Sequence, residues 1–107
     1  MIDMSMIFER KNEYATLYRF TIPFNIWQTV YLAHKKKWWK ENSKWVVTRC
    51  KINNVWVTDT YGVALNNGKQ IHCSQFDMLF TNKEEAIEYC IKKNAHAKVK
   101  VYDEATL

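Results

Sequence analysis

The first part of the chain carries two segments with the hydrophobic pattern of β-strands. Within residues 13–23, every second position from Tyr14 to Ile22 is apolar, aromatic or β-branched, which is typical of a half-buried strand. Pro23 ends this strand, because proline has no N–H to donate to a β-ladder. Residues 26–33 are rich in β-branched and aromatic side chains and predict a second strand.

The middle of the chain has the pattern of a β-meander built on one long strand over residues 45–57. Asn53-Asn54 interrupts this strand and predicts a bulge or tight bend, since asparagine tolerates left-handed backbone angles. A turn at 58–60, a strand at 61–65, a hairpin turn at 66–68 and a returning strand at 71–73 follow. The alternation places one set of side chains on the inner face of the long strand: Val46, Thr48, Cys50 and Ile52.

The period changes near the C-terminus. Thr81 and Glu84 have the spacing of a capping box, in which both side chains bind the first free amides of a helix. Apolar residues then recur at helical spacing up to Asn94, so we expect a helix at about 82–94. Residues 98–102 predict a short edge strand.

The order of these elements, together with several short stretches of their sequence, resembles that of small phage and prophage proteins with an SH3-like barrel. The resemblance covers roughly residues 24–92 and is carried by five segments: Ile26–Tyr31, Trp45–Val57, Tyr61–Val63, Asn67–Gly68 and Leu79–Ala86. The sequence departs from such proteins at Trp27, where they more often have glycine. The resemblance implies a non-enzymatic binding module from a virus-like genome, and it assigns no functional residues.

These patterns together predict an α+β fold in a single domain over residues 1–107. We expect a small, strongly bent antiparallel sheet or SH3-like barrel, followed by one C-terminal helix at about 82–94. A chain of 107 residues has the size of one hydrophobic core.

Charge and cysteine content narrow the setting in which the chain acts. The formal net charge of +5 favours acidic partners, which include nucleic acid, an anionic membrane surface and an acidic protein face. Charged residues interrupt the first residues after Met1, no apolar run is long enough to span a membrane, and the three cysteines are an odd number. We therefore expect a reduced cytoplasm, that of the host if the protein is of phage origin, and no membrane partner.

A basic and aromatic run between the second and third predicted strands is the clearest binding candidate. Its residues are Lys35, Lys36, Lys37, Trp38, Trp39, Lys40 and Lys44. Lysines that contact phosphates, beside a tryptophan that stacks on a base, suit single-stranded nucleic acid. The alternative is a solvated hairpin with one tryptophan packed on the sheet. On an extended strand Trp38 and Trp39 point to opposite faces, so at most one of them belongs to the core.

Trp45 and Trp56 form a second aromatic pair. The alternation places both on the outer face of the long strand, where exposed aromatic residues are favoured in protein interfaces. The alternative is that the first strand covers them with Tyr18 and Phe20, since an uncovered apolar patch is a liability.

Catalysis, metal binding and a cofactor are not expected. The cysteines and histidines contain no C-x-x-C or H-x-x-x-H pair. Cys50, Cys73 and Cys90 all fall on predicted inward faces, where a free thiol acts as a small apolar group. Catalysis would require a nucleophile beside a base, or paired carboxylates on neighbouring elements, and we name no such site from the sequence.

Three functions remain open. The first is a non-enzymatic module that binds and modulates a host or viral protein through an acidic surface, in host takeover or anti-defence. The second is binding of a nucleic acid, either DNA or RNA, through residues 34–45. The third is a virion or assembly component, which would form homo-oligomers through a sheet edge.

Overall fold

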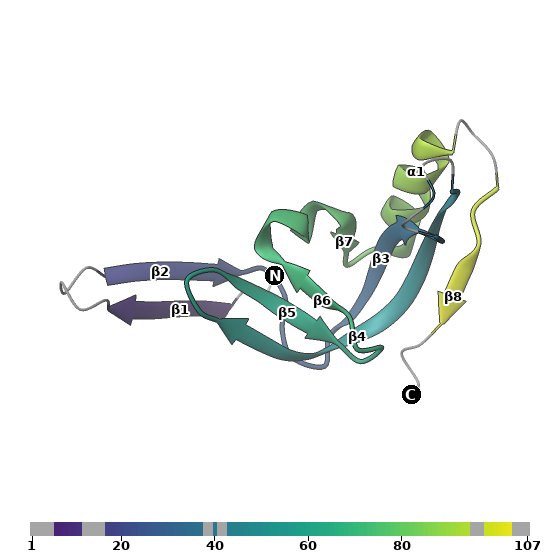
Figure 1. Cartoon of the computed structure of the whole chain (residues 1–107). Helices are drawn as coiled ribbons and strands as arrows, with labels where there is room; N and C mark the ends of the chain where they lie inside the picture. The colour runs from purple at the N-terminus through teal and green to yellow at the C-terminus, as the bar shows by residue number, and fades with distance from the viewer. Residues whose placement is uncertain (1–5, 12–16, 38–39, 41–42, 95–97, 104–107) are drawn as a thin grey trace.

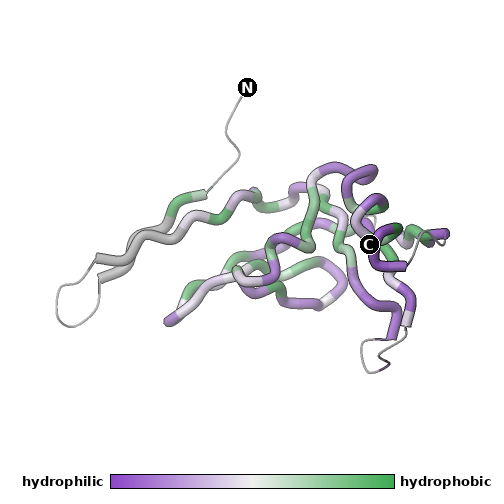
Figure 2. Tube along the Cα trace, turned by 90° about the horizontal axis from the view of Figure 1, so that it is seen from above, coloured by the Kyte–Doolittle hydropathy of each residue, from purple (hydrophilic) through white to green (hydrophobic). Residues whose placement is uncertain are grey.

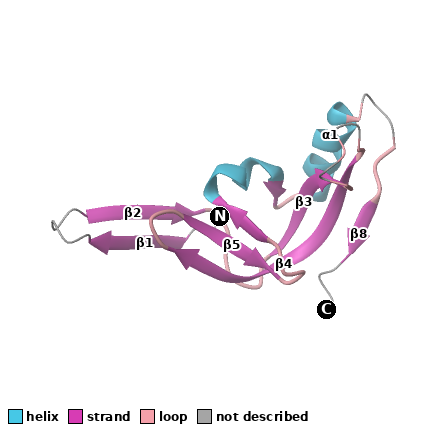
Figure 3. Cartoon of the chain, in the orientation of Figure 1, coloured by secondary structure: helices cyan, strands magenta, loops and turns pink. Residues whose placement is uncertain are grey.

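The computed structural model describes residues 6–11, 17–37, 40, 43–94 and 98–103. The elements in chain order are β1 (Met6–Lys11), β2 (Leu17–Ile22), β3 (Thr29–Lys35), β4 (Trp45–Val57), β5 (Tyr61–Leu65), β6 (Gln70–His72), the 3-10 helix η1 (Cys73–Met78), β7 (Leu79–Phe80), α1 (Lys83–Lys93) and β8 (Val101–Asp103). Figure 3 shows that strands dominate, and α1 is the α-helix of the described chain. The α+β class is therefore confirmed.

The main sheet has the strand order β6-β5-β4-β3-β7, and β8 joins it beside β4. Neighbours along this order are antiparallel, whereas β8 pairs in parallel with Val47–Arg49 of β4. Among the described strands, β6 and β7 stand at the two ends of the order, and no ladder joins them. The bent sheet is thus observed, and closure into a barrel is not.

The long strand β4 changes partner halfway along its length. Its first half pairs with β3, from Thr29↔Lys51 to Lys35↔Trp45. The register shifts between Ile52 and Asn54, and the second half pairs with β5. The predicted bulge at Asn53-Asn54 is confirmed, and it lets one strand serve both halves of the sheet.

Two hydrophobic cores lie on opposite faces of the sheet. The larger one, on the inner face, is Ile22, Phe24, Val30, Leu32, Cys50, Ile52, Val63, Leu65, Ile71 and Leu79. The smaller one lies under α1 and is built from Ala33, Val47, Ala86 and Cys90. Figure 1 shows α1 against the β3 and β4 end of the sheet. Because α1 covers the second face there, Val47 is buried as well as Val46 and Thr48.

The start of α1 differs from the expected capping box. Asn82 is the N-cap, and its side-chain oxygen accepts from the N–H of Glu84 at 2.8 Å and of Glu85 at 3.3 Å. The predicted pair of Thr81 and Glu84 is wrong, because the extended backbone at Asn82 starts the helix one residue later. Asn94 is the C-cap, as the sequence predicts.

The N-terminal hairpin forms a separate two-stranded sheet. Only β2 lies within the strand predicted at 13–23; β1, which pairs with it from Met6↔Ile22 to Lys11↔Leu17, was not predicted. Figure 1 and Figure 2 show this hairpin extending away from the main sheet. Its inner end is anchored by Ile22, which is fully buried, and by Met6, which packs on the larger core.

The segment between β2 and β3 is a turn, although the sequence predicts a strand there from residue 26. The N–H of Gln28 donates to the carbonyl of Asn25, and the N–H of Asn25 donates to Oε1 of Gln28. Trp27, inside this turn, has φ 66° and leaves 67% of its surface exposed. The strand β3 therefore begins at Thr29 instead of Ile26.

Candidate binding groove

A groove of about 330 Å³ opens where the main sheet is not closed. It lies between β3 and β6, with η1 at one end. The lining residues are Leu32, Ala33, His34, Lys35, Trp45, Lys69, Gln70, Ile71, Gln75 and Met78.

The groove follows the edges of two strands. Leu32 to Lys35 are four consecutive residues of β3, and Lys69 to Ile71 are consecutive at β6. Successive side chains of a strand point to opposite faces, so a hollow on one face would meet only alternate residues. The groove therefore meets β6 edge-on, and it meets β3 edge-on beyond the Leu32↔Leu79 pair with β7.

Apolar side chains of the larger core form the floor. Leu32 and Ile71 belong to that core and are 3% and 6% exposed, and Met78 of η1 adds a flexible apolar side chain. Such a floor suits an apolar group from a ligand.

His34 is held in place on the β3 side. Its Nδ1 lies 2.9 Å from the carbonyl oxygen of Lys35, and its Nε2 lies 2.7 Å from Oγ1 of the buried Thr48. A carbonyl only accepts, so in the neutral ring Nδ1 carries the proton and Nε2 accepts from the Thr48 hydroxyl. Both ring nitrogens thus fix the orientation of the imidazole.

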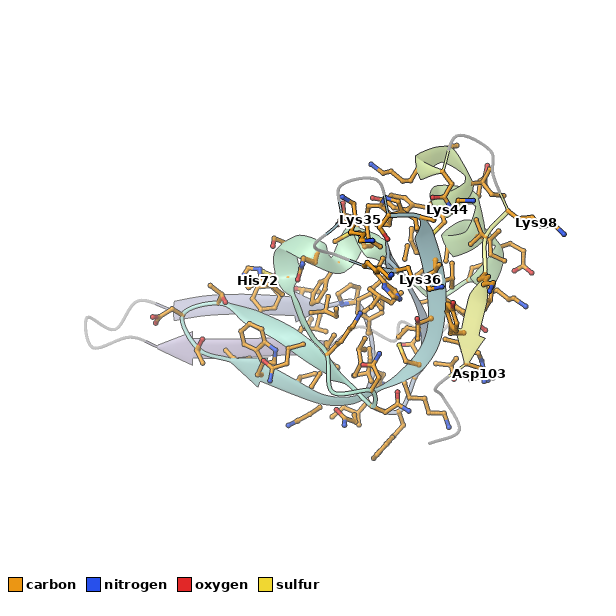
Figure 4. The ribbon with its side chains drawn as sticks, turned by 45° about the vertical axis from the view of Figure 1, so that its right-hand side comes forward. Lys35, Lys36, Lys44, His72, Lys98 and Asp103 are labelled. Atoms are coloured by element: carbon orange, nitrogen blue, oxygen red, sulfur yellow. The ribbon has the colours of Figure 1, made fainter. Side chains whose placement is uncertain are left out.

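Lysines surround the groove on the side of the β3–β4 hairpin. Lys35 lines it from β3, and Lys69 lines it from the position just before β6. The N–H of Lys36 donates to the carbonyl of Lys44 at 2.9 Å, which extends the hairpin by one pair beyond Lys35↔Trp45. Figure 4 shows Lys35, Lys36 and Lys44 gathered near this end of the sheet.

The structure brings together only some of the candidates named from the sequence. Lys35 and Trp45 line the groove, and Lys36, Lys37, Lys40 and Lys44 are exposed in the adjoining hairpin. Trp38 and Trp39 lie outside the described residues. That these residues bind a partner stays a prediction.

Trp45 does not point outward as the alternation indicates, because α1 covers it. Its ring lies 5.7 Å from that of Tyr89, edge to face, and Nζ of Lys93 stands 5.7 Å from its centroid. Both partners come from α1. Trp45 therefore joins the smaller core to one wall of the groove.

Trp56 lies in the other half of β4, on the far side of the bulge from Trp45. It is half-buried and pairs with Gly62, and its ring lies 6.0 Å from the ring of His72. Within the described chain its buried Nε1–H meets no hydrogen-bond acceptor. Trp45 and Trp56 are thus separate features and do not form one aromatic surface. The alternative, that Tyr18 and Phe20 cover them, rests on two side chains that lie outside the described ones.

The cysteines follow the expected burial at two positions of three. Cys50 and Cys90 are buried, and burial raises the pKa of the Cys90 thiol to about 11. Cys73 is only half-buried, because η1 begins there instead of a continuing strand. In the part of the chain that the structure describes, no three His, Cys, Asp or Glu side chains gather in a group that could hold a metal.

Sequence patterns did not reveal most of the groove. Lys69, Gln70, Gln75 and Met78 come from residues 69–78 and belong to no motif, whereas His34 opens the stretch 34–45 singled out from the sequence. Residues 69–78 reach the groove only through the tertiary placement of β6 and η1 beside β3.

Comparison with other proteins adds no assignment to this geometry. Among the described residues, no helix has both the length and the apolar character needed to cross a membrane. No family model, no curated protein and no solved structure matches the chain.

Proposed function

We propose that this protein is a non-enzymatic binding module of the small phage type, and that it holds an acidic segment of a partner protein in the groove. The observation that carries the proposal is an apolar floor beside lysines: Leu32 and Ile71 form the base, and Lys35 and Lys69 stand on two of its sides. A peptide segment in which an apolar side chain stands next to an Asp or Glu complements this arrangement, because the apolar group fits the floor and the carboxylate faces a lysine.

An SH3-like fold is part of the proposal. The strand order β6-β5-β4-β3-β7, with the 3-10 helix η1 between β6 and β7 and the helix α1 after β7, supports it. A host or viral protein is the class of partner that the resemblance implies.

Charge reversal at the groove tests the proposal. The probe is a pool of synthetic heptapeptides in which Asp or Glu alternates with Val or Ile, titrated into ¹⁵N-labelled protein. We expect chemical shift changes at groove residues and about tenfold weaker binding by the double variant Lys35→Glu, Lys69→Glu, since two ion pairs become repulsions.

The matched control is the double variant Lys83→Glu, Lys92→Glu. Both of these residues are exposed on α1 and neither lines the groove, so the net charge changes equally. Equal weakening by the two double variants would reduce the effect to overall charge and would refute a groove site.

Nucleic-acid binding is a second candidate, favoured by the exposed Lys36, Lys37, Lys40 and Lys44 of the β3–β4 hairpin. If four lysines neutralise phosphates of a single strand, log K falls against log salt with a slope of about −3. A gel-shift series with a mixed-sequence single-stranded oligonucleotide at two salt concentrations measures it. No shift at low salt, or a shift that Lys36→Glu and Lys37→Glu leave unchanged, rejects this candidate.

A further inference from the structure

The pairing of β5 with β6 shows which main-chain groups of β6 face away from the sheet. The N–H of Leu65 donates to the carbonyl of Lys69 at 2.8 Å, so these two residues form a hydrogen-bonded pair. Hydrogen-bonded and non-hydrogen-bonded pairs alternate along an antiparallel ladder. Ala64↔Gln70 and Gly62↔His72 are therefore non-hydrogen-bonded pairs, and the N–H and C=O of Gln70 and His72 point away from β5.

These two residues use their outward groups differently. The N–H of His72 donates to Oε1 of Gln75 at 3.2 Å, which satisfies it at the start of η1. The main-chain N–H and C=O of Gln70 have no hydrogen-bond partner within the described part of the chain, and Gln70 lines the groove. The groove thus holds one donor and one acceptor at the spacing of a β-strand.

From this geometry we infer that the partner segment binds as an added strand: an extended acidic stretch of protein pairs its main chain with Gln70 at the edge of β6. This inference rests on the proposed function and specifies how the segment is held. Alternate side chains of the added strand enter the floor formed by Leu32, Ile71 and Met78, and those between them place carboxylates near Lys35 and Lys69.

The chemistry of the groove favours a protein strand over a nucleic-acid strand as the occupant. A peptide group offers the complementary donor and acceptor to Gln70 at strand spacing, whereas a sugar–phosphate backbone carries no such repeat. The buried, apolar Leu32 and Ile71 accept aliphatic side chains, and the two lysines supply the charge complementarity that selects acidic sequences.

Hydrogen exchange tests the added strand directly. With the acidic heptapeptide pool at saturation, we expect the exchange of the Gln70 amide to slow at least tenfold, because a new hydrogen bond protects it. The amide of Asn67 in the adjacent hairpin turn serves as the internal control and keeps its rate. Unchanged exchange at Gln70 overturns the inference, as does protection by a mixed-sequence single-stranded oligonucleotide in place of the peptides.

A proline substitution tests the same bond by affinity. Gln70→Pro removes the outward N–H and spares the ladder to β5, which that N–H does not enter, and edge strands tolerate proline. We expect at least a tenfold loss of affinity for the peptide pool. The matched control Gln70→Ala, which keeps the N–H, binds within about twofold of the unmodified protein.

If circular dichroism shows that Gln70→Pro does not fold, the same hydrogen bond can be removed from the peptide instead. A peptide pool N-methylated at alternate positions should bind the unmodified protein at least tenfold more weakly. If a folded Gln70→Pro or the methylated pool binds normally, the added strand is excluded. The proposed function survives this result if the Lys35→Glu, Lys69→Glu variant loses binding, and it fails as well if that variant binds normally.

Discussion

The side chain of Asn94 forms both hydrogen bonds that a neighbouring strand would form with Trp45. Its Oδ1 accepts from the N–H of Trp45 at 2.7 Å, and its Nδ2 donates to the C=O of Trp45 at 2.8 Å. Lys36 and Lys44 form a hydrogen-bonded pair, so the next pair of the ladder, Lys35↔Trp45, is a non-hydrogen-bonded one. The main-chain N–H and C=O of Trp45 therefore face away from β3 and are open to Asn94. The end of α1 is thereby fixed to the start of β4.

Asn94→Ala should lower the free energy of unfolding by about 2 kcal/mol, since it removes two hydrogen bonds and leaves main-chain groups of the half-buried Trp45 unpaired. Urea unfolding followed by tryptophan fluorescence measures the change. The control is Lys92→Ala, an exposed residue in the same helical turn, for which we expect a change within about 0.5 kcal/mol. Equal effects of the two variants would show that the Asn94 contact contributes nothing.

Gly62→Ala should destabilise the protein by about 2 to 3 kcal/mol. A Cβ at this buried position would collide with the carbonyl oxygen of Ile71 and with the ring of Trp56, and the Ile71 carbonyl cannot move without disturbing β6. Gly68→Ala is the comparison, because no heavy atom lies within 4 Å of its Cβ position and only its φ of 89° is unfavourable. We expect it to cost about 1 kcal/mol. Thermal unfolding ranks the two, and the reverse order contradicts the packing described for Gly62.

Trp27 holds a backbone angle that bulky residues avoid. With φ at 66° and 67% of its surface exposed, Trp27→Gly should be more stable than Trp27→Ala by about 1 kcal/mol, because both lose the ring and only glycine relieves the left-handed angle. At Ile26, whose φ is not positive, the same comparison should reverse by about 0.5 to 1 kcal/mol. Denaturant unfolding of these four variants gives the stability difference between the Gly and Ala variants at each position. A difference of the same sign at both positions would argue against strain at Trp27.

Stability should fall at alkaline pH through Cys90. Burial raises the pKa of its thiol to about 11 from the ordinary 9.0, so between these values the folded state holds a proton that the unfolded chain has released. The free energy of unfolding therefore decreases as pH rises from 9 towards 11. The full contribution, present below pH 9 and lost above 11, is roughly 2 to 3 kcal/mol.

Cys90→Ala should flatten this pH dependence in part. Burial also raises the pKa of Tyr61 above 10.0, which leaves a residual slope of the same sign in the variant. Denaturant unfolding at several pH values between 8 and 11 gives both curves. If they run parallel, Cys90 does not titrate as its burial requires.

Much of the fold follows from local patterns in the sequence. The bounds of β4, its bulge and the hairpin turn ending at Gly68 could be predicted because period-two alternation and turn residues act over a few positions. The strand β1 could not, since Glu9, Arg10 and Lys11 mask its pattern and only pairing with β2 defines it. The turn at Asn25–Gln28 was hidden by the strand-like composition around Trp27.

The groove depends on tertiary contacts that no local pattern contains. Lys35 could be singled out by its charged neighbours, but Lys69 and Gln70 join it only because β6 ends at η1 without reaching β3. Trp45 was assigned to the surface because the alternation of one strand does not show that α1 will cover that face. Burial by a distant element is the information that sequence patterns lack.

The partner change along β4 has a thermodynamic consequence. The half of β4 that pairs with β3 contributes Val47 to the core under α1, whereas Ile52 and Val55, which pair with β5, pack in the core on the opposite face. Melting either end of β4 removes a wall from a core and weakens the ladder of the other half. The two cores therefore lack independent stability, and the main sheet should unfold in a single cooperative transition, with the same midpoint by every spectroscopic probe.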